Sequence, residues 1–375
     1  MSESLRLSLH RARVSARTTW WVAALHDADG RTGLGECSDA GPGARRVWAR
    51  AGALLRAGAG VPELAGHLDE DAGPDLARHT VLGALESALA DLRARRAGQP
   101  LWQALGGAEA RPVHRYANIN RALRTRTPQE FAEVARAAEA AGYRAVKCAP
   151  FDGLPPGDRL RKGLVRARAV RRALRPATEL MVDAHLLLDV EQVLRAAPAL
   201  AALDLRWLED AVPLDDPDAL AAVHAAGIAP LAGGEFATGP EQVRAALHSG
   251  HLAWLLPDVK HSGGLGPARR LAEAARAAGA RVSLHNPAGP VATAAGLHLA
   301  AALGPDTGAE TGAETGTEIE FAFGEARWRG TSVVPAEPAG ATAWLTPPPG
   351  PGLGLDLTAR HWRPVPLPRL DGALR

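Results

Sequence analysis

The chain has 375 residues and a mass of 39.1 kDa, and its 43 basic and 41 acidic side chains leave a formal net charge of +2. This balance gives no indication of nucleic acid or an anionic membrane as a partner, and no apolar run approaches the roughly 20 residues of a transmembrane helix. Residues 1–9 lack a signal-peptide core and the two cysteines, Cys37 and Cys148, lie far apart, so we expect a cytoplasmic protein without disulfides.

The first third of the chain predicts a small α+β unit. Residues 4–12 and 19–26 alternate as strands do, and an Asp-Gly turn predicts a hairpin to a third strand. After a Gly- and Arg-rich patch, residues 79–107 repeat apolar side chains at helical spacing until Gly98 and Pro100 end the helix.

From residue 111 onward, strands and helices alternate strictly. Seven or eight such units predict a TIM-type barrel, whose active site lies at the C-terminal ends of its strands. The repeated TGAE before the last strand is a low-complexity loop, so we expect Glu310 and Glu314 to be solvated. We expect a capping domain at 1–110, the barrel at 111–325, and a C-terminal segment at 326–375 that returns to the capping domain. The expected barrel strands lie at 112–118, 143–150, 180–188, 204–213, 228–236, 251–258, 280–287 and 317–321.

Three of these apolar runs end in a carboxylate, and the three acids, Asp183, Glu209 and Glu235, are 26 residues apart in each step. In a partly buried cleft they would repel one another by several kcal/mol unless a cation lay between them. Oxygen-only donors suit Mg²⁺, or Mn²⁺, better than Zn²⁺. The alternative is three unrelated acids that cap helices or solvate loops, but their regular spacing favours a metal site.

Lysine is rare among the basic residues, and Lys147, Lys162 and Lys260 are the three present. A chain that uses Arg almost everywhere should keep Lys where a compact ammonium with an adjustable pKa is needed. Lys147, at a strand end, could hold a substrate carboxylate or act as a base, or could simply extend its ammonium to solvent. Lys162 is expected on a helix surface. Lys260 could contact the substrate, although a surface role is nearly as well supported.

Two histidines are candidates for acid and base chemistry. Asp258 and His285 end neighbouring strands, so the carboxylate can fix the tautomer of the imidazole and raise its basicity. His185 follows Asp183 by two residues and should point to the same side of that strand. It could be a group behind the ligands, a fourth ligand or an acid/base, and we favour an acid/base.

A resemblance to a known family covers nearly the whole chain. The sequence resembles the enolase superfamily, in its mandelate racemase and muconate-lactonizing branch. The resemblance implies a capping domain over a (β/α)₇β barrel, with Mg²⁺ on the three carboxylates and a Lys or His base that forms an enediolate. The matching phrases are ESALADLRARRAGQPLWQALGG, GYRAVK, MVDAH, WLEDAVP, LAGGE, PDVKHSGGLG, SLHNPAGP and PGLGLDL.

Details within the branch separate the possible reactions. Asp258 with His285 resembles the mandelate racemase pattern, whereas muconate-lactonizing relatives carry Lys at the position of Asp258. Racemases of the family carry Lys-x-Lys on the second strand, where this chain has Ala149 in place of the second Lys. The Asp-x-His at Asp183 and the phrase HNPAGP resemble acid-sugar dehydratases of the galactonate type. By the same resemblance, Glu320 would hydrogen-bond the enolate oxygen in its protonated form.

These observations predict β-elimination of water from a hydroxy or sugar acid to a 2-keto-3-deoxy acid. His285 would remove the α proton, and His185 or the returning His285 would protonate the departing hydroxyl. Epimerisation is the second hypothesis, and a non-catalytic barrel used for binding or assembly is the third. We expect a small carboxylate substrate and a homo-oligomer. Substrate contacts are expected at Asn118, Asn120, Trp20 and Lys260, with specificity from capping loops near 18–21 and 36–41.

Overall fold

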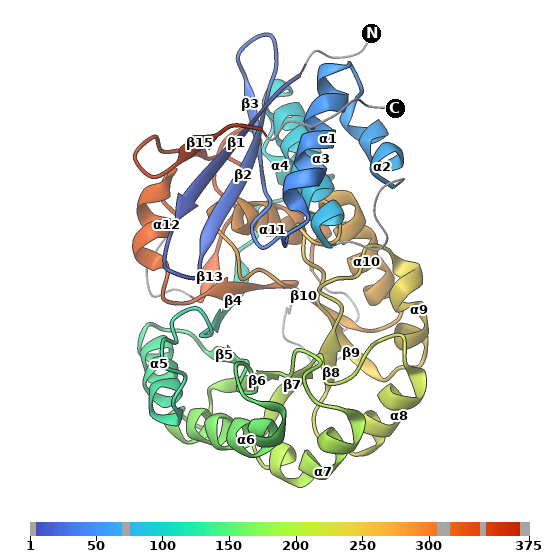
Figure 1. The fold of residues 1–375 in the computed structure, drawn as a ribbon, viewed down its shortest axis with the longest axis vertical. Helices are drawn as coiled ribbons and strands as arrows, with labels where there is room; N and C mark the ends of the chain where they lie inside the picture. The colour runs from blue at the N-terminus through green and yellow to red at the C-terminus, as the bar shows by residue number, and fades with distance from the viewer. Residues whose placement is uncertain (1–4, 70–75, 306–315, 338–342, 368–375) are drawn as a thin grey trace.

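A computed structural model describes residues 5–69, 76–305, 316–337 and 343–367. Eight parallel strands close into a barrel because the last of them, β11, pairs with the first, β4 (Figure 1). The predicted barrel is therefore confirmed. Its strands are β4 Val113–Asn118, β5 Ala145–Cys148, β6 Glu179–Asp183, β7 Leu205–Glu209, β8 Leu231–Gly233, β9 Leu252–Leu255, β10 Arg281–Leu284 and β11 Glu318–Ala322.

Seven helices follow the first seven barrel strands, and capping residues explain where several of them begin. Thr127 accepts a hydrogen bond from the Glu130 N–H, and Asp189 forms a reciprocal capping box with Gln192. These helices alternate with the strands as the sequence predicts. They are α5 Pro128–Ala140, α6 Pro156–Ala173, α7 Val190–Ala201, α8 Pro217–Ala225, α9 Pro240–His248, α10 Leu265–Ala277 and α11 Pro290–Leu303.

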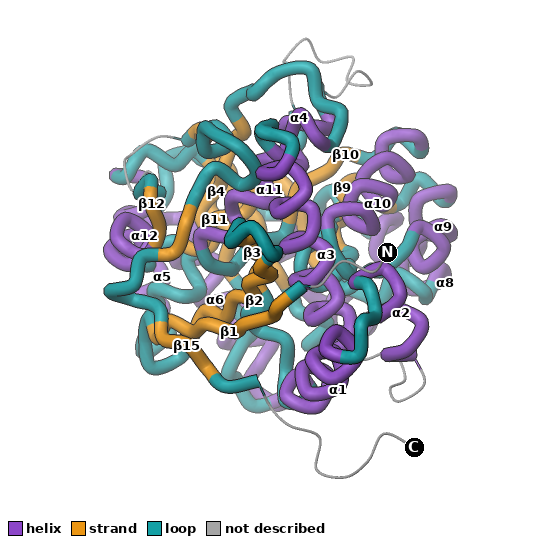
Figure 2. Tube along the Cα trace, turned by 90° about the horizontal axis from the view of Figure 1, so that it is seen from above, coloured by secondary structure: helices purple, strands orange, loops and turns teal. Residues whose placement is uncertain are grey.

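The capping unit lies over the barrel as a four-stranded antiparallel sheet with helices on one face (Figure 2). The sheet order is β15-β1-β2-β3, so the C-terminal strand joins the N-terminal sheet as expected. The Gly- and Arg-rich patch that the sequence analysis left unassigned forms two helices, because Ala, Leu and Arg are good helix formers. The elements are β1 Arg6–Arg13, β2 Thr19–His26, β3 Thr32–Glu36, α1 Ala44–Arg56, α2 Val61–Asp69, α3 Leu76–Arg96, α4 Leu101–Ala104 and β15 Arg363–Val365.

The remaining elements belong to the C-terminal segment, whose β13 pairs antiparallel with the start of β4. They are α12 Ala326–Ser332, β12 Val333–Val334, β13 Trp344–Leu345 and β14 Asp356–Leu357. The predicted solvated loop with Glu310 and Glu314 lies outside the described residues. Within those residues, none of the helices is long and apolar enough to cross a membrane. Cys37 and Cys148 are both buried free thiols, so the expectation of no disulfide between them is confirmed.

Two carboxylates of the capping unit fasten it to the barrel. Glu36, at the end of β3, accepts hydrogen bonds from the Gly289 and Ala292 N–H groups at the start of α11. Glu86, on α3, does the same for Leu265 and one further N–H group at the start of α10. The first N–H groups of a helix have no partner within the helix and carry a partial positive charge, so each carboxylate satisfies two of them.

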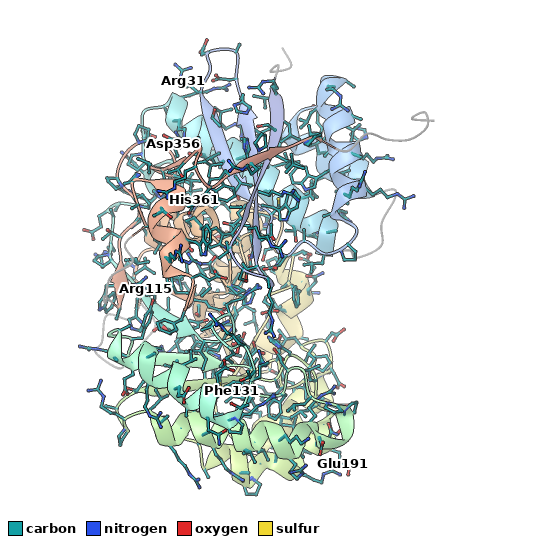
Figure 3. All side chains as sticks on the ribbon, turned by 60° about the vertical axis from the view of Figure 1, so that its left-hand side comes forward. Arg31, Arg115, Phe131, Glu191, Asp356 and His361 are labelled. Atoms are coloured by element: carbon teal, nitrogen blue, oxygen red, sulfur yellow. The ribbon has the colours of Figure 1, made fainter. Side chains whose placement is uncertain are left out.

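Close packing inside the capping unit depends on two glycines of β3. A side chain at Gly33 would collide with the Ala88 backbone, and one at Gly35 with the Ala84 backbone, both on α3. Glycine at these positions lets the strand and the helix touch. Side chains also fill the space between the ribbons, whereas Glu191 points outward at the far edge of the barrel (Figure 3).

Candidate active site

The barrel interior is built in two layers by the two-residue period of its strands. The lower layer is apolar and includes Tyr116, Met181 and Trp207, all buried. Two residues further along β6 and β7 come Asp183 and Glu209, which belong to a polar layer at the mouth. The layers are linked, since the Trp207 indole N–H donates to Glu209 Oε2 at 3.0 Å.

The three predicted metal ligands lie together at this mouth. Asp183 and Glu209 are paired in register on neighbouring strands, and Glu235 follows β8, the next strand. All three are buried. The Lys147 ammonium lies among them, 2.7 Å from Glu209 Oε1 and 3.6 Å from Asp183 Oδ2, and also 3.0 Å from Glu320 Oε2. Lys147 therefore does not extend to solvent.

The carboxylates affect one another strongly because they are close and buried. Burial and the charge of Asp183 raise the pKa of Glu209 well above its ordinary value, although Lys147 opposes the shift. Burial together with Glu235 and Asp183 raises the pKa of Asp210 to about 8. Burying these carboxylates together thus disfavours their ionised forms.

The chemistry of these residues fits a divalent cation. Among the described residues, no three His, Cys, Asp or Glu side chains enclose a metal position directly, since Lys147 lies between Asp183 and Glu209. The donor set nevertheless consists of oxygens alone, as Mg²⁺ prefers. Glu235 Oε2 is buried without a hydrogen bond in acceptable geometry, although His285 Nε2 lies 2.8 Å away. A buried oxygen of this kind fits a cation ligand.

His285 forms the predicted dyad with Asp258. Its Nδ1 lies 2.8 Å from Asp258 Oδ2, which leaves Nε2 facing Glu235. Both residues lie beyond the strand ends at Leu255 and Leu284, and the His285 N–H donates to the Pro257 carbonyl to hold the two loops together. Burial disfavours the charged ring, but Glu235 and Glu320 outweigh it and raise the pKa of His285 well above its usual range.

The alternative that Lys260 lies on the surface is wrong. Its ammonium is buried and lies 2.6 Å from Asp258 Oδ2, the same oxygen that faces His285 Nδ1. Nor does it point freely at a substrate. The reason is that its backbone N–H also donates to Asp258 Oδ1 at 2.7 Å, so the carboxylate holds the residue at both ends.

His185 lies at the site, but strand alternation is not what directs it there. β6 ends at Asp183, and His185 has a left-handed backbone with φ 48°, so strand alternation does not set its direction. Its ring lies between two carboxylates, with Nε2 2.9 Å from Asp183 Oδ2 and Nδ1 2.8 Å from Asp152 Oδ1. Although burial opposes protonation, Asp183 and Asp152 raise the pKa of His185 to about 11.

Glu320 lies in the middle of β11, the last barrel strand, in an environment that favours its ionised form. Burial would raise the pKa of Glu320, yet Lys147 and His285 hold it below the ordinary value. This opposes the protonated form that the resemblance implied. Asn118 donates to Glu320 and accepts from the Asn120 N–H, while Asn120 Oδ1 accepts from the Ala149 N–H. The structure therefore gives both amides partners within the protein.

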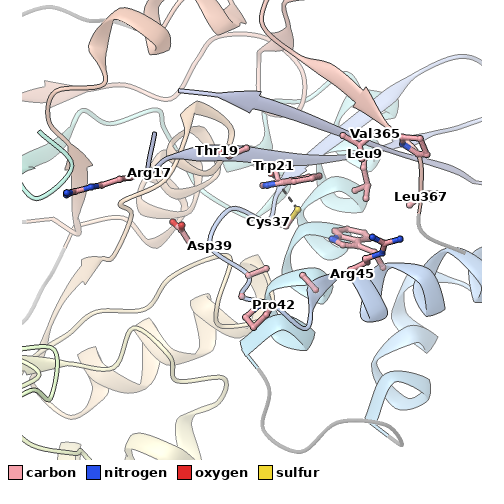
Figure 4. A pocket seen from close by; sticks show the side chains of 15 residues that line it. Leu9, Arg17, Thr19, Trp21, Cys37, Asp39, Pro42, Arg45, Val365 and Leu367 are labelled. Carbon is pink, nitrogen blue, oxygen red and sulfur yellow. Dashed lines mark hydrogen bonds between the residues drawn. The ribbon is translucent and has the colours of Figure 1, made fainter. Parts of the chain in front are cut away.

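The two adjacent tryptophans of β2 point to opposite sides of the sheet. Trp20 is only 1% exposed and packs near Trp362, so it is a core residue rather than a pocket wall. Trp21 instead lines a cavity of about 860 Å³ between the sheet and α1, together with Trp48 (Figure 4). None of the carboxylates of the barrel mouth lines this cavity, so it is distinct from the carboxylate cluster.

The capping loops reach the barrel at the rim of that cavity. Arg17 donates to the Leu123 and Arg124 carbonyls, and Asp39 pairs with Arg121 at 2.7 Å. The loops expected to set specificity thus contact the first loop of the barrel.

Four neighbours of the site were missed by sequence reasoning: Asp152, Asp210, Phe236 and His261. Three of them directly follow a residue that was singled out, and Asp152 lies four residues beyond the end of β5. These residues could therefore have been found by their position in the loops that directly follow barrel strands. Chain order alone could not show which of these side chains turn inward.

Comparison with known proteins identifies the class to which this barrel belongs. The sequence profile of the family described as enolase C-terminal domain-like matches residues 130–361. The chain belongs to this family, which confirms the resemblance in its sequence.

Two named relatives are similar to this chain over most or part of its length. The chain is 29% identical to a D-galactarolactone cycloisomerase of Agrobacterium fabrum over 88% of this chain and 86% of that protein. It is also 29% identical to a D-galactonate dehydratase family member of Streptomyces bingchenggensis, over 60% of this chain and about three fifths (61%) of that relative.

Solved structures agree on the fold. A putative dehydratase from Mesorhizobium loti superposes with a TM-score of 0.79 at 22% identity, covering 95% of this chain and 97% of that one. An enolase of the mandelate racemase subgroup from Agrobacterium tumefaciens gives 0.77 at 24% identity, with 97% and 99% covered. At these identities the likeness establishes the fold alone.

Proposed function

We propose that the chain removes the proton α to a carboxylate and then eliminates water from a hydroxy acid, giving a 2-keto-3-deoxy acid. The observation that carries the proposal is the His285–Asp258 dyad, whose Nε2 faces the carboxylate cluster of a barrel mouth. The dehydratase names among the relatives support the same reaction class.

Asp183, Glu209 and Glu235 would hold the divalent cation, Mg²⁺ or Mn²⁺, which when bound stabilises negative charge on a substrate carboxylate. Lys147 is the buried ammonium beside them and would donate to the same carboxylate. A fixed donor in a site closed to water stabilises developing charge without reorganising.

The proton transfers follow from the two histidines. A cation held by Glu235 would offset the carboxylate charge that keeps His285 protonated, so that the neutral ring is present as the base. His285 Nε2 then accepts the α proton while Asp258 holds Nδ1, and the electron pair of the C–H bond passes into the enolate. That pair then forms the C2–C3 double bond as the C3–O bond breaks. His185, held as an imidazolium by Asp152 and Asp183, gives its proton to the departing hydroxyl, which leaves as water. The enol becomes the 2-keto acid.

The test is keto-acid formation from a library of hydroxy acids with Mg²⁺. Replacement of one general base lowers turnover by about 10²–10⁴-fold, so His285→Asn should do so with the acid that the wild type converts. His248→Asn is a matched control, because His248 is exposed on α9 far from the mouth. Full turnover by His285→Asn would overturn the assignment.

Epimerisation is the second candidate, and one observation favours it. His185 follows β6 and His285 follows β10, four strands away in a ring of eight, so the two rings approach the mouth from opposite sides. Opposed bases are what inversion at a carbon requires. Solvent deuterium in recovered substrate, without keto acid, would support epimerisation over dehydration.

A further inference from the structure

An exposed aromatic side chain is connected to the proposed base through the ring of His261. Phe236 directly follows Glu235 and leaves 54% of its surface exposed. Its ring centroid is 5.6 Å from that of His261, which in turn is 6.4 Å from that of His285. Single exposed apolar residues are common on proteins, but this one belongs to a row of rings that ends at the catalytic imidazole.

A second exposed apolar side chain directly follows the other histidine. Leu186 is 49% exposed and has φ 51°, a left-handed backbone that bulky residues rarely adopt. The Leu186 N–H donates to the Asp210 carbonyl, which fixes this turn next to His185. An exposed apolar side chain thus directly follows His185, and another lies near His285 on the far side of His261.

Several hydrogen-bonding side chains at the mouth are directed at the protein itself. The amide of Asn286 donates to Thr293 and to the Glu320 carbonyl, and the amides of Asn118 and Asn120 are held as described above. Arg121 is paired with Asp39, and Arg126 donates to the Ala149 carbonyl. A polyhydroxylated acid needs partners for each hydroxyl that it buries, because an unpaired polar group is costly. The described side chains offer few such partners.

The loop after β3, which reaches the barrel through the pair of Asp39 with Arg121, adds few hydrogen-bonding groups. Past Asp39 it continues with Ala40, Gly41 and Pro42, none of which carries a hydrogen-bonding side chain (Figure 4). The charge of Asp39 is already neutralised by Arg121.

We infer that the substrate is a 2,3-dihydroxy carboxylate whose chain beyond C3 is an alkyl or aryl group rather than a row of hydroxyls, and that Phe236 contacts this group. The inference rests on the proposed function for the chemistry at C2 and C3. It adds the nature of the remaining chain, which the relatives named for sugar acids do not supply.

The experiment compares acids that differ only beyond C3: the stereoisomers of 2,3-dihydroxyhexanoate, and hexonates with the same configurations at C2 and C3. Binding is measured by calorimetry on the His285→Asn variant with Mg²⁺, and keto-acid formation on the wild type. An apolar subsite distinguishes such pairs by about 10²-fold, so the dihydroxyhexanoate should bind about 10²-fold more tightly. Phe236→Ser should reduce that preference about tenfold, whereas Val165→Ser, an exposed apolar position on α6, should not change it.

The outcomes separate the two proposals. Equal binding, tighter binding of the hexonate, no binding of either acid, or an unchanged preference in Phe236→Ser would overturn the inference. Keto acid formed from the hexonate alone would also overturn it while supporting the dehydration. A clear preference in binding without any keto acid would support the inference on substrate class and refute dehydration.

Discussion

The three lysines of the chain differ in how their ammonium groups are paired with carboxylates. Two of the three lysines, Lys147 and Lys260, are buried among carboxylates, whereas Lys162 lies on α6 with its side chain 47% exposed. A compact ammonium fits into such spaces where a planar guanidinium would not. The partner of Lys260, however, is Asp258, which precedes it by only two residues.

Removing this ammonium should destabilise the fold. We expect Lys260→Met to lower the free energy of unfolding by about 1–3 kcal/mol, because the buried Asp258 carboxylate loses a charged hydrogen-bond donor and keeps His285 beside it. The matched variant Lys162→Met breaks an exposed pair with Asp158, worth less than about 1 kcal/mol. Urea unfolding of both variants measures the difference, and equal losses would show that the Asp258 pair contributes no more than a surface pair.

His298 should make stability depend on pH. It is buried on α11, where Nδ1 accepts from the Trp102 N–H and Nε2 faces the Leu353 carbonyl, and burial lowers its pKa to about 4. The unfolded chain binds a proton below about pH 6.5, so the contribution is complete above that pH and is lost as the pH falls towards 4. Between pH 7 and 4.5 the wild type should lose about 2 kcal/mol more than His298→Gln. Parallel stability curves would contradict this.

At the scale of elements, the contact between α3 and α10 is open to a direct test. Glu86 accepts from the Leu265 and Gly266 N–H groups, and losing such a cap costs about 0.5–2 kcal/mol. We expect Glu86→Ala to lower the free energy of unfolding by about that amount. Glu191→Ala, at an exposed position on α7, is the control and should change it by less than about 0.5 kcal/mol. An effect of Glu86→Ala no larger than the control would mean that water replaces the cap.

The elements themselves were largely predictable, because strand period, helix caps and turn residues are local properties. The three carboxylates could be placed for the same reason, since each lies at or just beyond a strand end. The loops could not be predicted in this way. His185 adopts a left-handed backbone, so the strand alternation used to predict its direction does not apply to it. Its partner Asp152 lies 33 residues away in the sequence. Which loop side chains converge depends on barrel closure, and no local pattern encodes that.

At the scale of the whole molecule, the capping unit and the barrel are joined through polar contacts as well as apolar packing. Glu36 and Glu86 reach from the capping unit to two barrel helices, and the pair of Arg121 with Asp39 joins the loops above the mouth. The position of these loops therefore depends on the same contacts that hold the units together.

We expect the stability of the whole chain to depend on a divalent cation, because several carboxylates are buried together at the mouth. A ligand that binds only the folded state stabilises it by about 2.7 kcal/mol at a hundred times its dissociation constant. Urea unfolding with Mg²⁺ should therefore show a higher free energy of unfolding than with KCl at equal ionic strength. Glu235→Gln should remove most of this gain, because it replaces one oxygen anion of the cluster, whereas Glu191→Gln should keep it. A gain that KCl reproduces, or that survives in Glu235→Gln, would mean that Mg²⁺ acts by screening charge rather than by binding at the mouth.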